Sequence, residues 1–281
     1  MTTPVFLAVL ASALMHASWN ALVKVGLDRL LSISLIQVGC AIFALVGVAF
    51  VPLPHADAWP WLAASVILHI GYNVFLARAY RVGDLGQIYP IARGCAPLLV
   101  TLIGIGLLSD HPSSLGYAGI GLLVLGILCM AFPGGGQRHR LEHASLINAL
   151  MTSMFIAGYT LTDGSGARAN GDALGYVIWL FLLNGFAMLL VLVALNGTRA
   201  LPQLGRHWRI GLMGGALSLG AYGVTIWAMT MAPIALVAAL RETSVLFAIA
   251  IGVIWLKEPL RRERLLAGGL ILAGVALTHW G

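Results

Sequence analysis

The sequence predicts an all-α polytopic membrane protein, in which ten transmembrane helices form two inverted five-helix repeats. Hydrophobic residues make up 60% of the 281 residues and charged residues only 9%, whereas a soluble domain carries roughly 25% charged residues. The apolar residues form continuous runs of helix length, unlike the short alternating strands of a membrane barrel. The pattern of the first half also recurs in the second half.

The ten helices follow from the spacing of charged residues, prolines and glycines along the chain. A bilayer core about 30 Å thick is crossed by about 20 apolar residues in a helix. The expected helices cover 4–24, 30–52, 59–80, 85–108, 113–132, 144–163, 173–195, 208–231, 234–256 and 263–280. The first of them lacks a basic leading region and a cleavage site, so we expect it to remain as a helix. Short loops leave no room for a soluble domain.

The basic residues indicate the orientation of the chain. The formal charge is +6, but the lysines and arginines lie in short loops, which argues against a nucleic-acid partner. Apart from Arg93, Arg168 and Arg241, every Lys and Arg lies at loops 1–2, 3–4, 5–6, 7–8 or 9–10. Basic loops face the cytoplasm. We therefore expect a multi-pass inner-membrane protein with both termini outside the cytoplasm, inserted as a monomer or a homodimer.

A comparison of the chain with itself pairs Arg93 with Arg241 and Asp110 with Glu258. The same shift pairs glycines of the fifth and tenth segments, where small residues allow close helix contact. Each copy has an odd number of helices, so the second copy crosses the membrane in the opposite sense. The predicted units are a first repeat over 1–133, a basic linker over 134–143 and a second repeat over 144–281.

Two segments of the chain resemble a known family. Residues 228–277 resemble the last three helices of an EamA domain of the drug/metabolite transporter superfamily, and residues 77–128 resemble them more weakly. The most specific element is an acid before a proline, in KEP (257–259) and SDHP (109–112). The opening HASWN (16–20) also resembles a bacterial branch associated with phosphonate utilisation.

This resemblance implies ten helices around a central cavity and the transport of small metabolites without ATP. In the phosphate-translocating branch, basic residues on the fourth and ninth helices hold a phosphate, and Arg93 and Arg241 lie on those helices here. The sequence departs from the family at Asp110, where a Glu is usual. The predicted location of both termini outside the cytoplasm also differs from that in many relatives, whose termini are placed inside.

Three charged residues, Arg93, Arg241 and Glu242, fall inside predicted helices. Each would cost about 2.5–3.5 kcal/mol in lipid, so they are expected to face protein or water. Their excess positive charge suits an anion, because guanidinium offers a planar fork to carboxylate or phosphate. Alternatively, Glu242 or Asp163 neutralises the arginines and the cluster only fastens the two halves. Adjacent side chains diverge by about 100°, so Glu242 is not expected to pair well with Arg241.

Other polar and aromatic residues recur at helical spacing and complete the predicted substrate site. They are His16, Trp19 and Asn20 on the first segment, His69, Tyr72 and Asn73 on the third, Tyr89 on the fourth, Tyr159 and Asp163 on the sixth, and Tyr222 on the eighth. Taken singly, each could be an interhelical hydrogen bond worth about 0.6 kcal/mol. Pro90 and Pro97 are expected to interrupt the fourth segment.

Together these features predict a secondary transporter that moves a small anionic or zwitterionic metabolite by alternating access. An aminophosphonate, a phosphonate or an amino acid would fit, with a proton or a counter-substrate as coupling partner. No catalytic arrangement, metal-ligand spacing, cofactor motif or ATP-binding loop is recognisable. The alternatives are a flippase for a phosphate-bearing lipid carrier and an exporter in which the arginines are purely structural.

Overall fold

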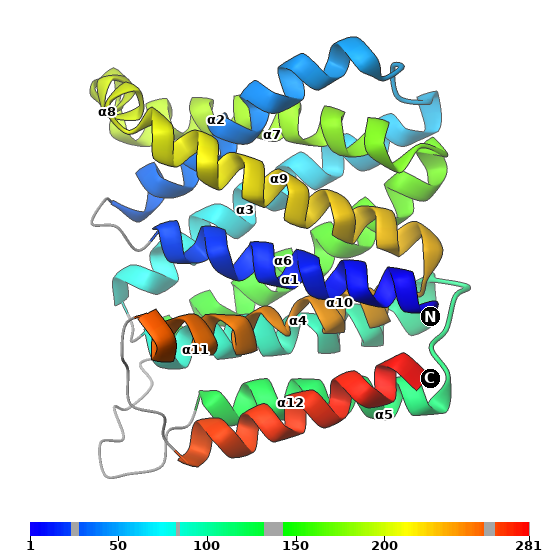
Figure 1. The fold of residues 1–281 in the computed structure, drawn as a ribbon. Helices are drawn as coiled ribbons and strands as arrows, with labels where there is room; N and C mark the ends of the chain where they lie inside the picture. The colour runs from blue at the N-terminus through cyan, green and yellow to red at the C-terminus, as the bar shows by residue number, and fades with distance from the viewer. Residues whose placement is uncertain (24–27, 83–84, 132–142, 256–261, 281) are drawn as a thin grey trace.

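The structure is a computed structural model that describes residues 1–23, 28–82, 85–131, 143–255 and 262–280. Every regular element in these residues is a helix (Figure 1). The main helices are α1 (Thr3–Val23), α2 (Arg29–Gly47), α3 (Trp59–Val82), α4 (Leu85–Leu107), α5 (Ser114–Met130), α6 (His143–Asn170), α7 (Ala173–Asn196), α9 (Trp208–Met231), α10 (Ile234–Arg241), α11 (Ser244–Trp255) and α12 (Arg262–Trp280). Shorter ones are η1 (Val48–Phe50), η2 (Ala56–Ala58), η3 (Thr198–Ala200) and α8 (Leu201–Arg206).

Seven helical stretches within the described residues are long and apolar enough to cross a membrane. Two shorter apolar helices, α5 and α12, accompany them. Many large apolar side chains on these helices are exposed, such as Leu45, Leu107 and Leu190. A bilayer would cover such surfaces, because lipid tails are as apolar as these side chains. The molecule is therefore an all-helical, multi-pass membrane protein.

The sixth helix is longer than its sequence predicts. The expected segment, 144–163, ends at an acid followed by glycines, but α6 continues to Asn170. The glycines are needed for packing here: a Cβ atom on Gly164 would lie only 2.5 Å from Cδ1 of Ile234. The helix stops at Gly171, whose φ of 72° suits glycine.

The ninth predicted segment, 234–256, is two helices rather than one. Helix α10 ends at Arg241 and α11 starts at Ser244, while residue 256 lies outside the described residues. Between them, the Glu242 N–H donates to the Ala239 carbonyl at 3.1 Å instead of reaching four residues back. The Thr243 hydroxyl also donates to the Leu240 carbonyl within α10, at 2.7 Å. Threonine hydroxyls often compete in this way with the backbone N–H groups that extend a helix.

Helix α4 runs without interruption through Pro90 and Pro97, contrary to the prediction that they break it. Neighbouring hydroxyl groups support its backbone. The Ser153 hydroxyl on α6 donates to the Ala92 carbonyl at 2.9 Å, and Thr101 donates to the Pro97 carbonyl at 2.8 Å. Such side-chain hydrogen bonds are how membrane helices tolerate proline.

The main packing pairs are α5 with α12, α3 with α6, α1 with α9, α2 with α7 and α9, and α4 with α6 (Figure 1). Helices α5 and α12 approach most closely through glycines, as predicted. A Cβ atom on Gly126 would lie 2.8 Å from the Ala267 carbonyl oxygen, and one on Gly274 would lie 2.8 Å from that of Gly119. This pair joins the two halves of the chain, backbone against backbone.

The bundle has two distinct ends (Figure 1). Both chain termini lie at one end, here called the terminal end. At the opposite end of the bundle, the chain leaves α1 and α3 and enters α2, α4 and α6. This second end carries Arg29, Arg206 and Arg264 and is called the basic end.

Candidate functional site

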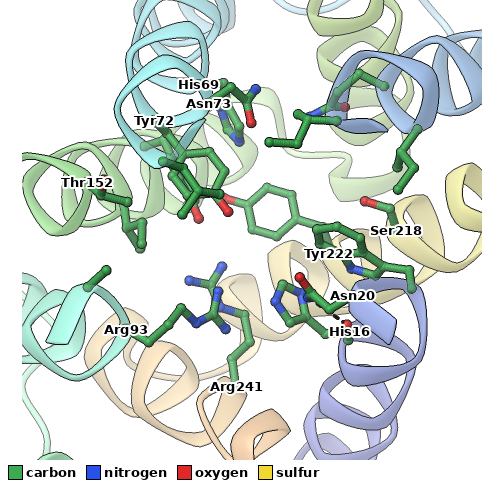
Figure 2. Close-up of a pocket in the computed structure, with 18 of the residues that line it drawn as sticks. His16, Asn20, His69, Tyr72, Asn73, Arg93, Thr152, Ser218, Tyr222 and Arg241 are labelled. Atoms are coloured by element: carbon green, nitrogen blue, oxygen red, sulfur yellow. Dashed lines mark hydrogen bonds between the residues drawn. The ribbon is translucent and has the colours of Figure 1, made fainter. Parts of the chain in front are cut away.

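A cavity of about 70 Å³ lies inside the bundle (Figure 2). Its walls come from eight helices: α1, α2, α3, α4, α6, α7, α9 and α10. The residues that line it are His16, Trp19, Asn20, Arg29, Ile33, Ile36, Gln37, His69, Tyr72, Asn73, Leu76, Ala92, Arg93, Thr152, Ile156, Tyr159, Phe181, Ser218, Tyr222 and Arg241. Most lie in the last part of α1 and α3 or the first part of α2, α4 and α6. The cavity is therefore displaced toward the basic end.

The structure brings together most of the residues that the sequence proposed for a substrate site. The predicted residues that line the cavity are His16, Trp19, Asn20, His69, Tyr72, Asn73, Arg93, Tyr159, Tyr222 and Arg241. Asp163 and Glu242 are fully buried behind the cavity wall instead. Tyr89 belongs to α4, but its side chain lies outside the described residues.

The two buried arginines meet at the break between α10 and α11. The Nε atom of Arg93 donates to Oε2 of Glu242 at 2.6 Å, so α4 and the α10–α11 break are joined by an ion pair. Arg93 also donates to the Ser244 hydroxyl at 3.5 Å. As expected for neighbours in sequence, Glu242 and Arg241 pair poorly: an Arg241 nitrogen lies 3.6 Å from Oε1 of Glu242, and this oxygen has no hydrogen-bond partner among the described residues. The irregular backbone at this break is compatible with that approach.

Arg241 keeps part of its hydrogen-bonding capacity for the cavity. Its side chain is 3% exposed, and its guanidinium carbon lies 5.9 Å and 5.6 Å from the ring centres of Tyr159 and Tyr222. Among the described residues, its Nε atom is buried without a hydrogen-bond partner. Figure 2 shows both guanidinium groups pointing toward the aromatic side of the cavity. A buried donor without a partner is costly, so this atom marks a place where a ligand would be stabilised.

Two further cavity residues have a buried polar atom without a partner in the described part of the chain. These atoms are the indole Nε1 of Trp19, which can only donate, and Oε1 of Gln37, which can only accept. Residues of the cavity wall thus carry two buried donors and one buried acceptor that have no hydrogen-bond partner among the described residues.

On the far wall of the cavity, aromatic rings surround a buried carboxylate. The Tyr222 hydroxyl donates to Oδ2 of Asp163 at 2.6 Å, and the Tyr176 hydroxyl donates to Oδ1 at 3.2 Å. The His69 ring stacks on Tyr159 with ring centres 4.1 Å apart. Nε2 of His69 lies 4.0 Å from Oδ2 of Asp163.

The cavity also contains residues that the sequence interpretation left out. Arg29 was counted only as a loop residue, and Gln37 and Thr152 were not considered, yet all three line the cavity. Arg29, Ile33 and Gln37 follow one another at a spacing of four residues, which places them on one face of α2. That spacing was the available signal for Arg29 and Gln37.

Near the end of α6, Arg168 bridges two connections at the terminal end of the bundle. One of its nitrogens lies 2.7 Å from Oδ2 of Asp110, in the connection between α4 and α5. The same guanidinium donates to the Met229 and Ala232 carbonyls, at 2.6 to 3.1 Å. Arg168 therefore ties the α4–α5 connection to the α9–α10 connection at the end opposite the one toward which the cavity is displaced.

Comparison with known proteins adds an identification to this geometry. Residues 144–280 match the model of the EamA-like transporter family. This half of the chain belongs to the EamA-like transporter family. It contains the broken α10–α11 segment and the wall residues Tyr159, Tyr222 and Arg241, whereas most residues of the cavity wall come from the first half. Members of the family are membrane transporters of small molecules, and the predicted resemblance of residues 228–277 to an EamA domain is confirmed.

The whole chain shares its fold with a solved structure that is described as "Crystal structure of protein". The similarity covers 99% of both chains, with a TM-score of 0.77 and 15% sequence identity. At this identity the likeness concerns the fold alone. No curated protein sequence matches the chain. The fold of both halves therefore has a known counterpart, whereas the ligand of the cavity must be argued from its residues.

Proposed function

We propose that this membrane protein is a secondary transporter that moves a small anionic or zwitterionic metabolite through the cavity by alternating access. The observation that carries the proposal is Arg241, a cavity-lining guanidinium that is buried and whose Nε atom has no partner in the described residues. An arginine keeps its charge at any physiological pH. A ligand with a carboxylate, phosphate or phosphonate group would supply the missing acceptor.

The balance of charge around the cavity supports an anion. Arg93 and Arg241 bring two positive charges close together, and Glu242 brings one negative charge. An anionic group would offset this excess, and its hydrogen bonds to guanidinium would be strengthened by the low dielectric of the interior.

The free acceptor in the cavity favours a zwitterion over a simple anion. The sequence suggested Glu242 or Asp163 as the partner of a substrate amine, but both are buried behind the wall. Oε1 of Gln37 lies in the wall and has no partner among the described residues. An ammonium group could donate to it while the acidic group binds Arg241. Aminophosphonates and amino acids have this chemistry.

Two features support alternating access. First, the helix contacts come in matched pairs. In a five-helix repeat α1 corresponds to α6, and α3 corresponds to α9. The contact between α3 and α6 then has its counterpart in the contact between α9 and α1, and both are present. An inverted repeat would produce this pattern. Second, the cavity lies toward the basic end, while Arg168 bridges two connections at the terminal end. This asymmetry is what one state of an alternating-access cycle would have.

Ligand-dependent melting of the purified protein tests the proposal. The panel contains phosphate, aminomethylphosphonate, glycine, a sugar and an organic cation, applied to the wild type, Arg241→Gln and the exposed control Arg206→Ala. A ligand that binds only the folded state raises the melting temperature. We expect an acidic or zwitterionic compound to stabilise the wild type and Arg206→Ala but not Arg241→Gln. Stabilisation by the sugar or the cation alone would contradict the proposal, and loss of folding in Arg241→Gln with no ligand response in the wild type would make the arginines structural.

A further inference from the structure

We infer that His69 and Asp163 together form a proton-binding site beside the substrate cavity, and that its proton is coupled to the anion at Arg241. The proton site stands on the geometry of these two side chains. Its coupling to transport rests on the proposed function.

The contacts of His69 favour one of its two ring nitrogens as the one that carries a proton. Nδ1 lies 3.0 Å from the Ser65 carbonyl oxygen, one turn earlier on α3. A carbonyl oxygen only accepts hydrogen bonds, so a proton on Nδ1 is needed to make this contact favourable. The Ser65 hydroxyl, 3.1 Å from Nδ1, can adjust its own proton to either arrangement. In a neutral ring, Nε2 is then left with a lone pair.

That lone pair faces a carboxylate. Nε2 lies 4.0 Å from Oδ2 of Asp163, and both side chains are buried, at 7% and 0% exposure. Without a further proton, two acceptors would face each other in a region of low dielectric. One proton resolves this, either on Nε2 as an imidazolium paired with the carboxylate or on Asp163 as a neutral acid. The pair therefore holds one proton more than a neutral Nδ1–H histidine beside an ionised aspartate.

Asp163 is placed to hold a proton rather than a substrate group. Its two oxygens already accept from Tyr176 on α7 and Tyr222 on α9, and the side chain is absent from the cavity wall. A substrate amine would have to displace both hydroxyls to reach it. His69 does line the cavity, so it can take up a proton from there; passing it on to Asp163 requires the 4.0 Å gap between Nε2 and Oδ2 to shorten to hydrogen-bond distance.

The charged and titratable groups around the pair connect it to the anion site. Tyr159 stacks on His69, Tyr222 bonds Asp163, and the guanidinium of Arg241 on α10 lies over both rings. Beyond Arg241 are Glu242 and Arg93 of α4. The arginine cluster alone, with Arg93, Arg241 and Glu242, carries one excess positive charge, and the ionised Asp163 behind the wall balances it when the proton site is empty. Adding an anion and a proton together keeps these buried groups neutral, whereas adding either alone does not, so each favours the binding of the other.

The proton site is tested first without any substrate. Nuclear magnetic resonance of ¹⁵N-histidine-labelled protein, assigned with His69→Gln, reports the protons on each His69 nitrogen, and infrared spectroscopy reports a protonated carboxyl group. We expect Nδ1–H plus either a second ring proton or a carboxylic acid signal at neutral pH, and loss of that extra proton in Asp163→Asn but not in Asp57→Asn. A neutral His69 with its proton on Nε2 beside an ionised Asp163 would overturn the inference.

The coupling is tested by calorimetry with aminomethylphosphonate in buffers of different ionisation enthalpy, which counts the protons taken up on binding. The measurement is made at the pH where the first experiment finds the site half occupied. We expect proton uptake in the wild type and none in Asp163→Asn. Binding without proton uptake would overturn the coupling alone. Absence of binding would count against the proposed function, while the spectroscopic result would still decide the proton site.

Discussion

At the scale of single residues, the function depends on how a few buried charges are compensated. Glu242 is fully buried and contacts both Arg93 and Arg241. A buried ion pair adds little net stability when complete, but its rupture leaves an uncompensated charge. Glu242 thus allows two arginines to exist inside the bundle, while Arg241 retains an unused donor for a ligand. The structural and the functional interpretations of the arginines, which the sequence set against each other, apply to different atoms of the same cluster.

This role of Glu242 predicts that Glu242→Gln destabilises the protein strongly. Removing one partner of a buried pair costs about 3–5 kcal/mol, and here the guanidinium of Arg93 loses its contact at 2.6 Å. The melting temperature in an anion-free buffer measures the effect, with the exposed Asp57→Asn as control. An unchanged melting temperature in Glu242→Gln would mean that water in the cavity, rather than Glu242, stabilises the arginines.

Removing the hydroxyl of Tyr222 gives a second prediction at this scale. In Tyr222→Phe, Asp163 loses its shortest hydrogen bond, at 2.6 Å, while the aromatic ring beside Arg241 remains. A hydrogen bond to a charged group contributes about 1.5–3 kcal/mol, so we expect a lower melting temperature with ligand-dependent stabilisation retained. Tyr176→Phe, which loses the longer bond of 3.2 Å, should have a smaller effect. A larger effect in Tyr176→Phe would show that Asp163 depends mainly on α7.

At the scale of helices, the contact between α5 and α12 joins the two halves through glycine. Replacing a mid-helix glycine by alanine normally favours the helix by about 1 kcal/mol. At Gly126 the added Cβ would lie 2.8 Å from the Ala267 carbonyl oxygen, whereas nothing lies within 4 Å of a Cβ on Gly121. We expect Gly126→Ala to lower the melting temperature and Gly121→Ala, on the same helix, to leave it unchanged or raise it. Equal behaviour of the two variants would show that α5 and α12 can separate without loss.

The break between α10 and α11 shows what the sequence could and could not predict. Hydrophobic segments along the chain located the helices apart from this break, and the paired arginines with the polar residues at helical spacing located half of the residues that line the cavity. The positions of Asp163 and Glu242 behind that wall depend on how helices distant in sequence pack. Arg29 was missed for a different reason: it lies at the start of α2, where a basic residue is equally expected to flank a loop. Hydropathy cannot distinguish a basic residue that flanks a loop from one that lines a cavity.

At the scale of the whole molecule, Arg168 must release its contacts if the cavity is to open at the terminal end. It joins Asp110, in the first half, to carbonyls at the end of α9, in the second half. Both members of the ion pair are partly exposed, at 32% and 24%, so the pair is accessible to water and weaker than the buried cluster. Asp110→Asn should therefore favour the state that is open at the terminal end without unfolding the protein.

The rate at which a membrane-impermeant thiol reagent labels Ser218→Cys, in a background without the native cysteines, measures this opening. Ser218 lines the cavity, so reagent added from the terminal side reaches it only when that end opens. We expect faster labelling in Asp110→Asn than in the parent. Asp172→Asn is the control, because Asp172 lies at the same end but its side chain accepts from Leu174 within its own helix. If both variants label at the parental rate, Arg168 does not control access, and closure of the terminal end depends on the apolar packing of α9 and α10 against α1 and α6.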